Sequence, residues 1–355
     1  MRRRAFLAAL GAAPLLARAQ GVRYPDVTPD FRLDLPRDHG AHPDFRQEWW
    51  YVTGWLATGK GESLGFQVTF FRARPDIVTA NPSAFVPRQV ILAHAAISDP
   101  KLGRLRHEER ASRDALGLAG ATEGNTHAWV DDWKIELKDG LLRTRVKARE
   151  FALDLEFVPS RIPVANGDTG YSRKGPRPED ASYYYSWTQL KTRGFVERAG
   201  VTEDVRGTSW MDHEWSSQYM PEGAQGWDWC GINLDGGGSL MAFRMRDKQG
   251  GALWAGGTLL AQDDRARALA RDQLTFTPVR RWRSPRTGTE YPVEMKVNVL
   301  GREWTLEPLM DDQELDARAS TGTIYWEGAV RAKLDGVRVG LGYLELTGYW
   351  RPMKL

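Results

Sequence analysis

The hydrophobic pattern of the chain follows the two-residue period of β-strands over most of its length. Residues 48–56 and 64–72 are rich in aromatic and β-branched side chains and flank a turn at Thr58–Gly61, which predicts a β-hairpin. Further strands are predicted at residues 90–98, 129–137, 141–148, 151–157, 182–190, 192–201, 294–300, 302–306, 322–332 and 337–350. Only residues 263–272 have helical composition.

An aromatic pattern occurs twice along the chain. The segment Trp50–Gly54 with the strand after it parallels Trp227–Gly231 with its following strand, at an offset of about 175 residues. We therefore expect an all-β fold of two tandem barrels, of the up-and-down or lipocalin-like (calycin) type, packed together. The predicted domains are residues 20–200 and 201–355, and one large sandwich is the alternative.

The first residues have the features of an export signal. Arg3-Arg4 begins a twin-arginine pattern, an apolar run continues to Leu16, and the small residues of Ala17–Ala19 precede a cleavage site. The apolar run is shorter than the roughly 20 residues that cross a bilayer. We expect residues 1–19 to be a twin-arginine signal peptide, the mature protein to be periplasmic, and no stable membrane insertion after cleavage.

Composition is that of an ordinary globular protein. The 355 residues are 41% hydrophobic and 27% charged, so the chain can form a sizeable core in one or two domains. The signal segment holds four of the 49 basic residues and none of the 46 acidic ones, so the mature chain has a net charge near −1. No electrostatic argument for nucleic-acid binding is left. The single cysteine, Cys230, allows no internal disulfide.

The densest ionisable cluster is Asp212-His213-Glu214, inside the aromatic stretch from residue 207 to 246. A strand here would place Met211, His213 and Trp215 on one face, and Trp210, Asp212 and Glu214 on the other. His213 beside an indole is a candidate proton donor or acceptor, and two nearby carboxylates raise the pKa of one of them. The alternative is that the carboxylates face solvent or pair with arginine, while His213 is a hydrogen-bonded core residue.

A second polar group precedes the first predicted strand. His39 and His42 have a metal-like spacing, and Glu48 could complete a site. The chain has no HExxH motif and no second histidine pair, so we expect no metal and favour turn or cap roles. Glu48 is then either a buried, hydrogen-bonded carboxylate or an acid that faces a ligand.

Aromatic side chains recur at strand spacing and are candidates for ligand binding. Apart from Glu48, the expected ligand-binding residues are Trp50, Tyr183, Tyr185, Trp187, Trp227, Trp229 and Phe243. Rings of this kind could line a barrel that encloses an apolar molecule, or they could simply fill the core. Exposed tryptophans that bind carbohydrate are a third possibility. The glycines after Asp235 lack the lysine of a phosphate-binding loop and predict a hairpin turn.

Several segments together resemble the AttH-like and carotenoid 1,2-hydratase family. They are DHGAHPDFRQEWWYVTGWL (38–56), SYYYSWTQL (182–190), GTSWMDHEWSSQ (207–218), GWDWCGINL (226–234) and YLELTGYW (343–350). The resemblance covers nearly all of the mature chain. It implies two lipocalin-like domains with an apolar, isoprenoid or lipid-like ligand held within or between the barrels, and no cofactor.

For the hydratase branch, the resemblance implies acid-catalysed addition of water to a terminal C=C bond. His213 would then be the acid–base residue and Trp215 the ring that stabilises the cation, with Asp212 and Glu214 tuning them. Exported members resemble companions of ABC lipid-transport systems. The strand at 239–246 offers Phe243 but no carboxylate. We therefore expect a protein that binds a hydrophobic ligand, with an ABC transporter as candidate partner and hydratase activity as the alternative.

Overall fold

The computed structural model describes residues 21–77, 81–83 and 85–353, so the signal segment predicted at 1–19 lies outside the described residues. Within these ranges the ordered elements are strands and two short 3-10 helices, η1 (Arg37–His39) and η2 (Arg271–Gln273). No helix among them has the length and apolar character needed to cross a membrane. The all-β prediction is confirmed.

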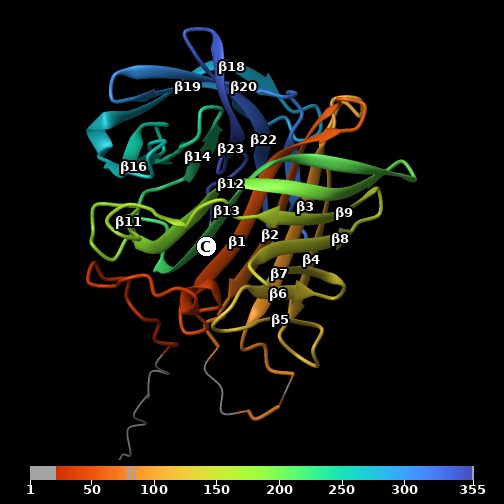
Figure 1. Cartoon of the computed structure of the whole chain (residues 1–355). Coiled ribbons are helices and arrows are strands. Elements are labelled where there is room, and N and C mark those ends of the chain that lie inside the picture. Colours follow the sequence, from red (N-terminus) through yellow and green to blue (C-terminus); the bar gives the residue numbers. More distant parts are fainter. Residues whose placement is uncertain (1–20, 78–80, 84, 354–355) are drawn as a thin grey trace, which may run out of the picture.

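The first sheet, which we name barrel A, curves into a nearly closed barrel in which β4 and β5 lie close together. Its strands are β1 (Gln47–Thr58), β2 (Ser63–Ala73), β3 (Val90–Ser98), β4 (Arg106–Arg113), β5 (Ala119–Ala121), β6 (His127–Val130), β7 (Trp133–Lys138), β8 (Leu141–Lys147), β9 (Phe151–Val158), β10 (Val164–Ala165), β11 (Tyr171–Arg173), β12 (Ala181–Arg198) and β13 (Val201–Gln218). The hairpin of β12 and β13 extends to one side of the molecule (Figure 1).

The second sheet, barrel B, is built in the same way from the rest of the chain. Its strands are β14 (Gly226–Leu234), β15 (Ser239–Arg246), β16 (Ala252–Leu260), β17 (Ala266–Leu269), β18 (Leu274–Arg283), β19 (Glu290–Val299), β20 (Arg302–Pro308), β21 (Glu314–Ala317), β22 (Thr323–Leu334) and β23 (Val337–Leu346). The glycine turn after Asp235 joins β14 to β15 as predicted. Gly238 has φ +78° there, and a Cβ at this position would come within 2.4 Å of the Leu260 carbonyl oxygen.

In each barrel the first strand pairs antiparallel with the last, β1 with β13 and β14 with β23. The two barrels meet along these strands, which lie side by side at the centre of Figure 1. Close approach depends on Gly65 of β2, because a Cβ there would lie 2.6 Å from Ala329 and 2.7 Å from the Tyr343 hydroxyl of barrel B. The outer faces of the barrels are therefore packed on one another, and each barrel keeps its own core.

Three details differ from the sequence predictions. The helix predicted at 263–272 is wrong: residues 266–269 form β17, which pairs with β16, because only Leu269 there is buried and no apolar helical stripe exists. The change of sheet falls between Gln218 and Gly226 rather than at residue 200, because β13 closes barrel A against β1.

The third difference concerns the aromatic repeat. The repeated hairpins are β1–β2 and β14–β15, but the predicted alignment is one residue out of register. Trp50 points into barrel A, whereas Trp227 lies on the outer face of barrel B.

Candidate functional site

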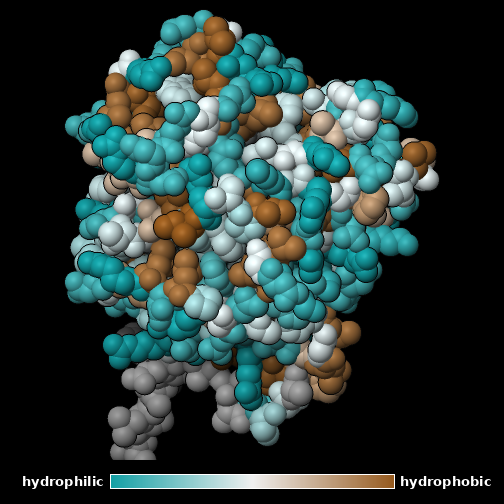
Figure 2. All heavy atoms as spheres, in the orientation of Figure 1, coloured by the Kyte–Doolittle hydropathy of each residue, from teal (hydrophilic) through white to brown (hydrophobic). Residues whose placement is uncertain are grey.

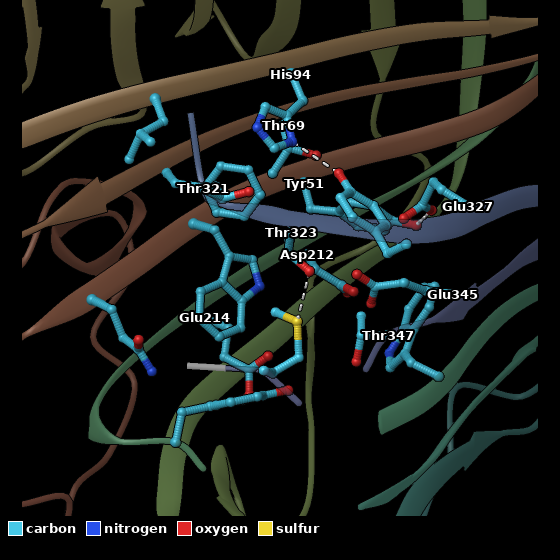
Figure 3. A pocket seen from close by; sticks show the side chains of 18 of the residues that line it. Tyr51, Thr69, His94, Asp212, Glu214, Thr321, Thr323, Glu327, Glu345 and Thr347 are labelled. Carbon is cyan, nitrogen blue, oxygen red and sulfur yellow. Dashed lines mark hydrogen bonds between the residues drawn. The ribbon is translucent and has the colours of Figure 1, made fainter. Parts of the chain in front are cut away.

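A cavity of about 280 Å³ lies between the outer faces of the two barrels. Barrel A contributes β1, β2, β3 and β13, and barrel B contributes β14, β22 and β23. Its walls combine aromatic side chains with polar ones (Figure 3). The aromatic lining residues are Trp49, Tyr51, Phe71, Tyr219, Trp227, Trp229 and Tyr325.

Two carboxylates of the central motif reach this cavity from β13. Asp212 accepts hydrogen bonds from the Ser186 hydroxyl (2.6 Å), the Trp210 indole (2.6 Å) and the Tyr184 hydroxyl (2.8 Å). Glu214 accepts one from the Ser182 hydroxyl and forms an ion pair of 2.8 Å with the buried Lys174 ammonium. Both side chains are thereby fixed in direction before any ligand enters.

Two more carboxylates reach the same space from barrel B (Figure 3). Glu345 of β23 accepts a hydrogen bond of 2.7 Å from the Trp227 indole. Glu327 of β22 accepts one on Oε1 from the Tyr51 hydroxyl of barrel A. Its Oε2 is buried and has no hydrogen-bond partner among the described residues, and the same holds for Oε1 of Gln67. Such orphaned acceptors indicate a place where a ligand or water donates a hydrogen bond.

Burial dominates the electrostatics of this cavity. It raises the pKa of Asp212 to about 7 against the hydrogen bonds that this carboxylate accepts, and it raises the pKa of Glu345 to about 7 as well. Burial and the nearby Glu345 raise the pKa of Glu327 well above its usual range. Burial also raises the pKa of Glu214, which Lys174 only partly offsets. The site therefore holds carboxyl groups that can carry a proton near neutral pH.

The histidine of the same motif lies on the opposite side of the sheet. His213 is fully buried in barrel A, where its ring centre lies 4.8 Å from that of Trp50, on which it stacks, and 4.9 Å from that of Trp215. Its Nε2 donates to Glu48 Oε1 (2.8 Å), and its Nδ1 lies 3.2 Å from the Tyr185 hydroxyl. Burial lowers its pKa, although Glu48 opposes that effect. His213 does not line the interdomain cavity.

The N-terminal arm fills one end of barrel A around Glu48. His42 stacks on Trp215 at 3.8 Å and donates from Nδ1 to Glu48 Oε1 (2.7 Å), while Arg72 donates to Glu48 Oε2 (2.7 Å). Burial opposes the charge on Glu48, but Arg72 and His42 outweigh it and hold the pKa of Glu48 well below its usual range. Burial would likewise lower the pKa of His42, but Glu48 and Asp38 outweigh it and raise that pKa.

His42, Glu48 and His213 bring three potential metal-ligand atoms within 4.8 Å of one another. A divalent cation requires neutral imidazoles and a free carboxylate. Here Arg72 already binds Glu48, and the raised pKa of His42 favours its protonated form. These residues form an internally satisfied ion cluster, and the chemistry of the donor set does not suit a metal.

The structure divides the sequence-predicted site residues between these two places. Those inside barrel A are Trp50, Tyr183, Tyr185, Trp187, His213 and Trp215. Those at the interdomain cavity are Asp212, Glu214, Trp227 and Trp229, with Phe243 in the adjoining apolar cluster. Glu48 borders the cavity but directs its carboxylate into barrel A.

Sequence reasoning missed Glu327, Glu345 and Gln67. The available signal was an acidic residue two positions from a tyrosine within an apolar strand, as in Tyr325-Trp326-Glu327 and Tyr343-Leu344-Glu345. A carboxylate in the middle of a strand that is buried on both faces is uncommon without a role or a partner.

The possibility that exposed tryptophans bind carbohydrate is disfavoured. None of the fifteen tryptophans is exposed, so a row of solvent-facing indoles for carbohydrate does not exist. The pattern G-x-S-x-G occurs at Gly61–Gly65, but it lies in the β1–β2 hairpin and no helix follows it, unlike a nucleophile elbow.

The face shown in Figure 2 is mostly hydrophilic, with apolar groups in separate small patches.

The ion cluster in barrel A makes a prediction about stability. Glu48→Gln leaves Arg72 buried without its counter-charge, so we expect the free energy of unfolding at pH 7 to fall by about 3–5 kcal/mol. Because the folded pKa of Glu48 is depressed, this contribution is present above the unfolded pKa and is lost as pH falls. Urea unfolding of both proteins between pH 3 and pH 7 measures it.

The control is Asp154→Asn, which breaks an exposed ion pair with Arg145 and should cost less than about 1 kcal/mol. An equal loss in both variants, or a Glu48→Gln effect that does not shrink at low pH, would contradict this account of the cluster.

Comparisons with known proteins agree with this architecture. The crystal structure of an AttH protein from Nitrosomonas europaea is 46% identical, with a TM-score of 0.86 over 92% of this chain and 99% of that one. Kievitone hydratase from Nectria haematococca has a TM-score of 0.68 at 16% identity, over 92% of this chain and 97% of that one. CghA with Sch210972 has a TM-score of 0.51 at 11% identity, over 93% and 98% of the two chains.

The last two likenesses are to distant proteins and show the fold alone. Among curated proteins none matches this chain. The family model described as AttH-like matches residues 26–349, which is nearly the whole described structure. The chain belongs to the AttH-like family.

Proposed function

We propose that this protein binds a small, largely apolar molecule in the cavity between its two barrels. The observation that carries the proposal is a partly open space with aromatic side chains in its walls, in which Glu327 Oε2 and Gln67 Oε1 are buried without hydrogen-bond partners among the described residues. Ligand sites commonly combine apolar walls with a few convergent polar groups. The packed rings inside barrel A offer His213 no comparable space, which favours the interdomain cavity.

Filling the cavity tests the proposal. Leu92 lines it from β3, so Leu92→Trp should occupy part of the volume and weaken binding of lipid-like and isoprenoid ligands at least about tenfold, because the ligand loses its contacts. Quenching of intrinsic tryptophan fluorescence reports binding, since Trp49, Trp227 and Trp229 line the site.

Leu118→Trp is the matched control, because this leucine is 53% exposed and lies away from the cavity. Equal affinity in both variants would place the ligand elsewhere, and no quenching of the unaltered protein by any apolar ligand would refute binding.

Hydratase activity is the second candidate function, and it is favoured by the carboxyl groups with a pKa near 7. Asp212 could protonate one carbon of a terminal alkene, leaving a tertiary cation that the aromatic walls stabilise. A water molecule would then add to the cation, and its proton would return to a carboxylate. The fold is shared with kievitone hydratase, an enzyme whose name denotes the addition of water.

A hydratase incubated with an acyclic isoprenoid in H₂¹⁸O should yield labelled tertiary alcohol. We expect Asp212→Asn to abolish the label, because this side chain faces the cavity. Glu303→Gln, on the exposed surface of β20, should retain it. Mass spectrometry measures the product, and the absence of label from the unaltered protein would exclude the reaction for that substrate.

We also propose, from the N-terminal sequence alone, export to the periplasm by the twin-arginine route. From the resemblance to exported family members, we propose an association there with an ABC exporter of lipids. Replacing Arg3 and Arg4 by lysine should leave the uncleaved protein in the cytoplasm, because the export machinery reads that pair. Immunoblots of cell fractions measure this. Unchanged periplasmic protein would reject the route, and co-purification from gently solubilised membranes tests the transporter association.

A further inference from the structure

The interdomain cavity has more acidic side chains than basic ones. Asp212 and Glu214 enter it from barrel A, and Glu327 and Glu345 enter it from barrel B. Lys174 forms an ion pair with Glu214. Within residues 21–77, 81–83 and 85–353, no lysine, arginine or histidine makes an ion pair with the other three carboxylates. The site thus lacks positive charge that its own side chains could supply.

Two buried oxygens without hydrogen-bond partners also favour a positively charged ligand. Glu327 is 1% exposed, and its Oε2 has no hydrogen-bond partner among the described residues. Gln67 is 1% exposed, and its Oε1 is an acceptor without a donor. Once Glu327 gives up its proton, both oxygens are acceptors, and an occupant that satisfies them must bring N–H or O–H groups or positive charge. An anion would add further acceptors.

The walls favour positive charge as well. Ring faces attract ammonium groups, and Trp49, Trp227 and Trp229 line the cavity. The chain already holds one ammonium group beside the cavity in this manner. Lys174 Nζ lies 4.3 Å from the centre of the Phe243 ring and 4.9 Å from that of Tyr184, while it contacts Glu214. A carboxylate and aromatic rings therefore already bind an amine at the edge of this space.

We propose that the cavity selects an apolar organic cation, an amine or quaternary ammonium with an apolar body, over a neutral molecule of the same shape. This inference rests on the proposed function, because it requires that the cavity accept a ligand. Without a ligand, protons occupy the carboxyl groups, since burial raises the pKa of Asp212 and Glu345 to about 7. Entry of a cation then displaces protons.

Several other titratable groups face these carboxyls from the elements packed around them. They are Tyr51 on β1, His94 on β3, Tyr184 on β12, Lys174 and Glu214, Tyr219 after β13, Tyr325 and Glu327 on β22, and Tyr343 on β23. Burial lowers the pKa of His94 to about 3, and burial raises that of each tyrosine, so neither His94 nor any of these tyrosines changes charge between pH 6 and pH 8 in place of the carboxyls.

Two probes of equal shape separate charge from size. Benzyltrimethylammonium and neopentylbenzene differ only by nitrogen in place of carbon, and tryptophan quenching of the mature protein measures both affinities. At pH 8 the cation should bind at least about tenfold more tightly. Its affinity should fall about tenfold from pH 8 to pH 6, as one carboxyl with a pKa near 7 takes up a proton, while the neutral probe should bind equally at both pH values.

Glu345→Gln should weaken the cation about tenfold and leave the neutral probe unchanged, because glutamine keeps an acceptor for Trp227 but loses the charge. Glu303→Gln, an exposed residue of barrel B, should change neither affinity. Retained binding of the neutral probe shows that the variant is folded.

Equal affinities for the two probes would overturn the charge selection and leave the proposed ligand site standing. Failure of both probes to bind would overturn the charge selection and the ligand site together. A cation affinity that does not change with pH or with Glu345→Gln would overturn the assignment to these carboxyl groups.

Discussion

The antiparallel pairing of β1 with β13 decides where every group of this protein's polar motif lies. Successive side chains of a strand point to opposite faces, and both faces of β13 are buried over residues 209–216, where it pairs with β1. One face is the interior of barrel A and the other is the contact with barrel B. Asp212 and Glu214 therefore enter one environment and His213 another, although they are neighbours in sequence.

The pKa values of buried carboxyl groups shift in opposite directions in the two environments. In barrel A, Glu48 is ionised because Arg72 and His42 offset its burial, and its contribution to stability is lost as pH falls. Between the barrels, Asp212 and Glu345 lack such cations, and burial raises their pKa values. Each of these two groups therefore favours the folded state only while it is protonated. That contribution is present below the unfolded pKa and is lost as pH rises through about 7. Buried charges that are paired with an opposite charge usually serve the stability of the fold, whereas buried ionisable groups without such a partner are typical of functional sites.

Much of the fold could be predicted from the sequence, and the site only in part. Strand alternation and turn chemistry gave the hairpins, and strand alternation correctly separated His213 from Asp212. What could not be read is which side of a strand faces a partner barrel, because Trp50 and Trp227 look alike in sequence yet point to different cores. Glu327 and Glu345 were missed because their significance depends on contacts between strands more than a hundred residues from Tyr51 and Asp212.

The central claim is that the space between the barrels holds carboxyl groups that carry protons near neutral pH because no cation is paired with them. Infrared difference spectroscopy of the ligand-free protein against Glu327→Gln at pH 7 measures this directly, through the carbonyl stretch of a protonated carboxyl group. The account predicts a protonated-carboxyl band in the unaltered protein that Glu327→Gln lacks. A spectrum in which Glu327 contributes only the bands of an ionised carboxylate at pH 7 would contradict it.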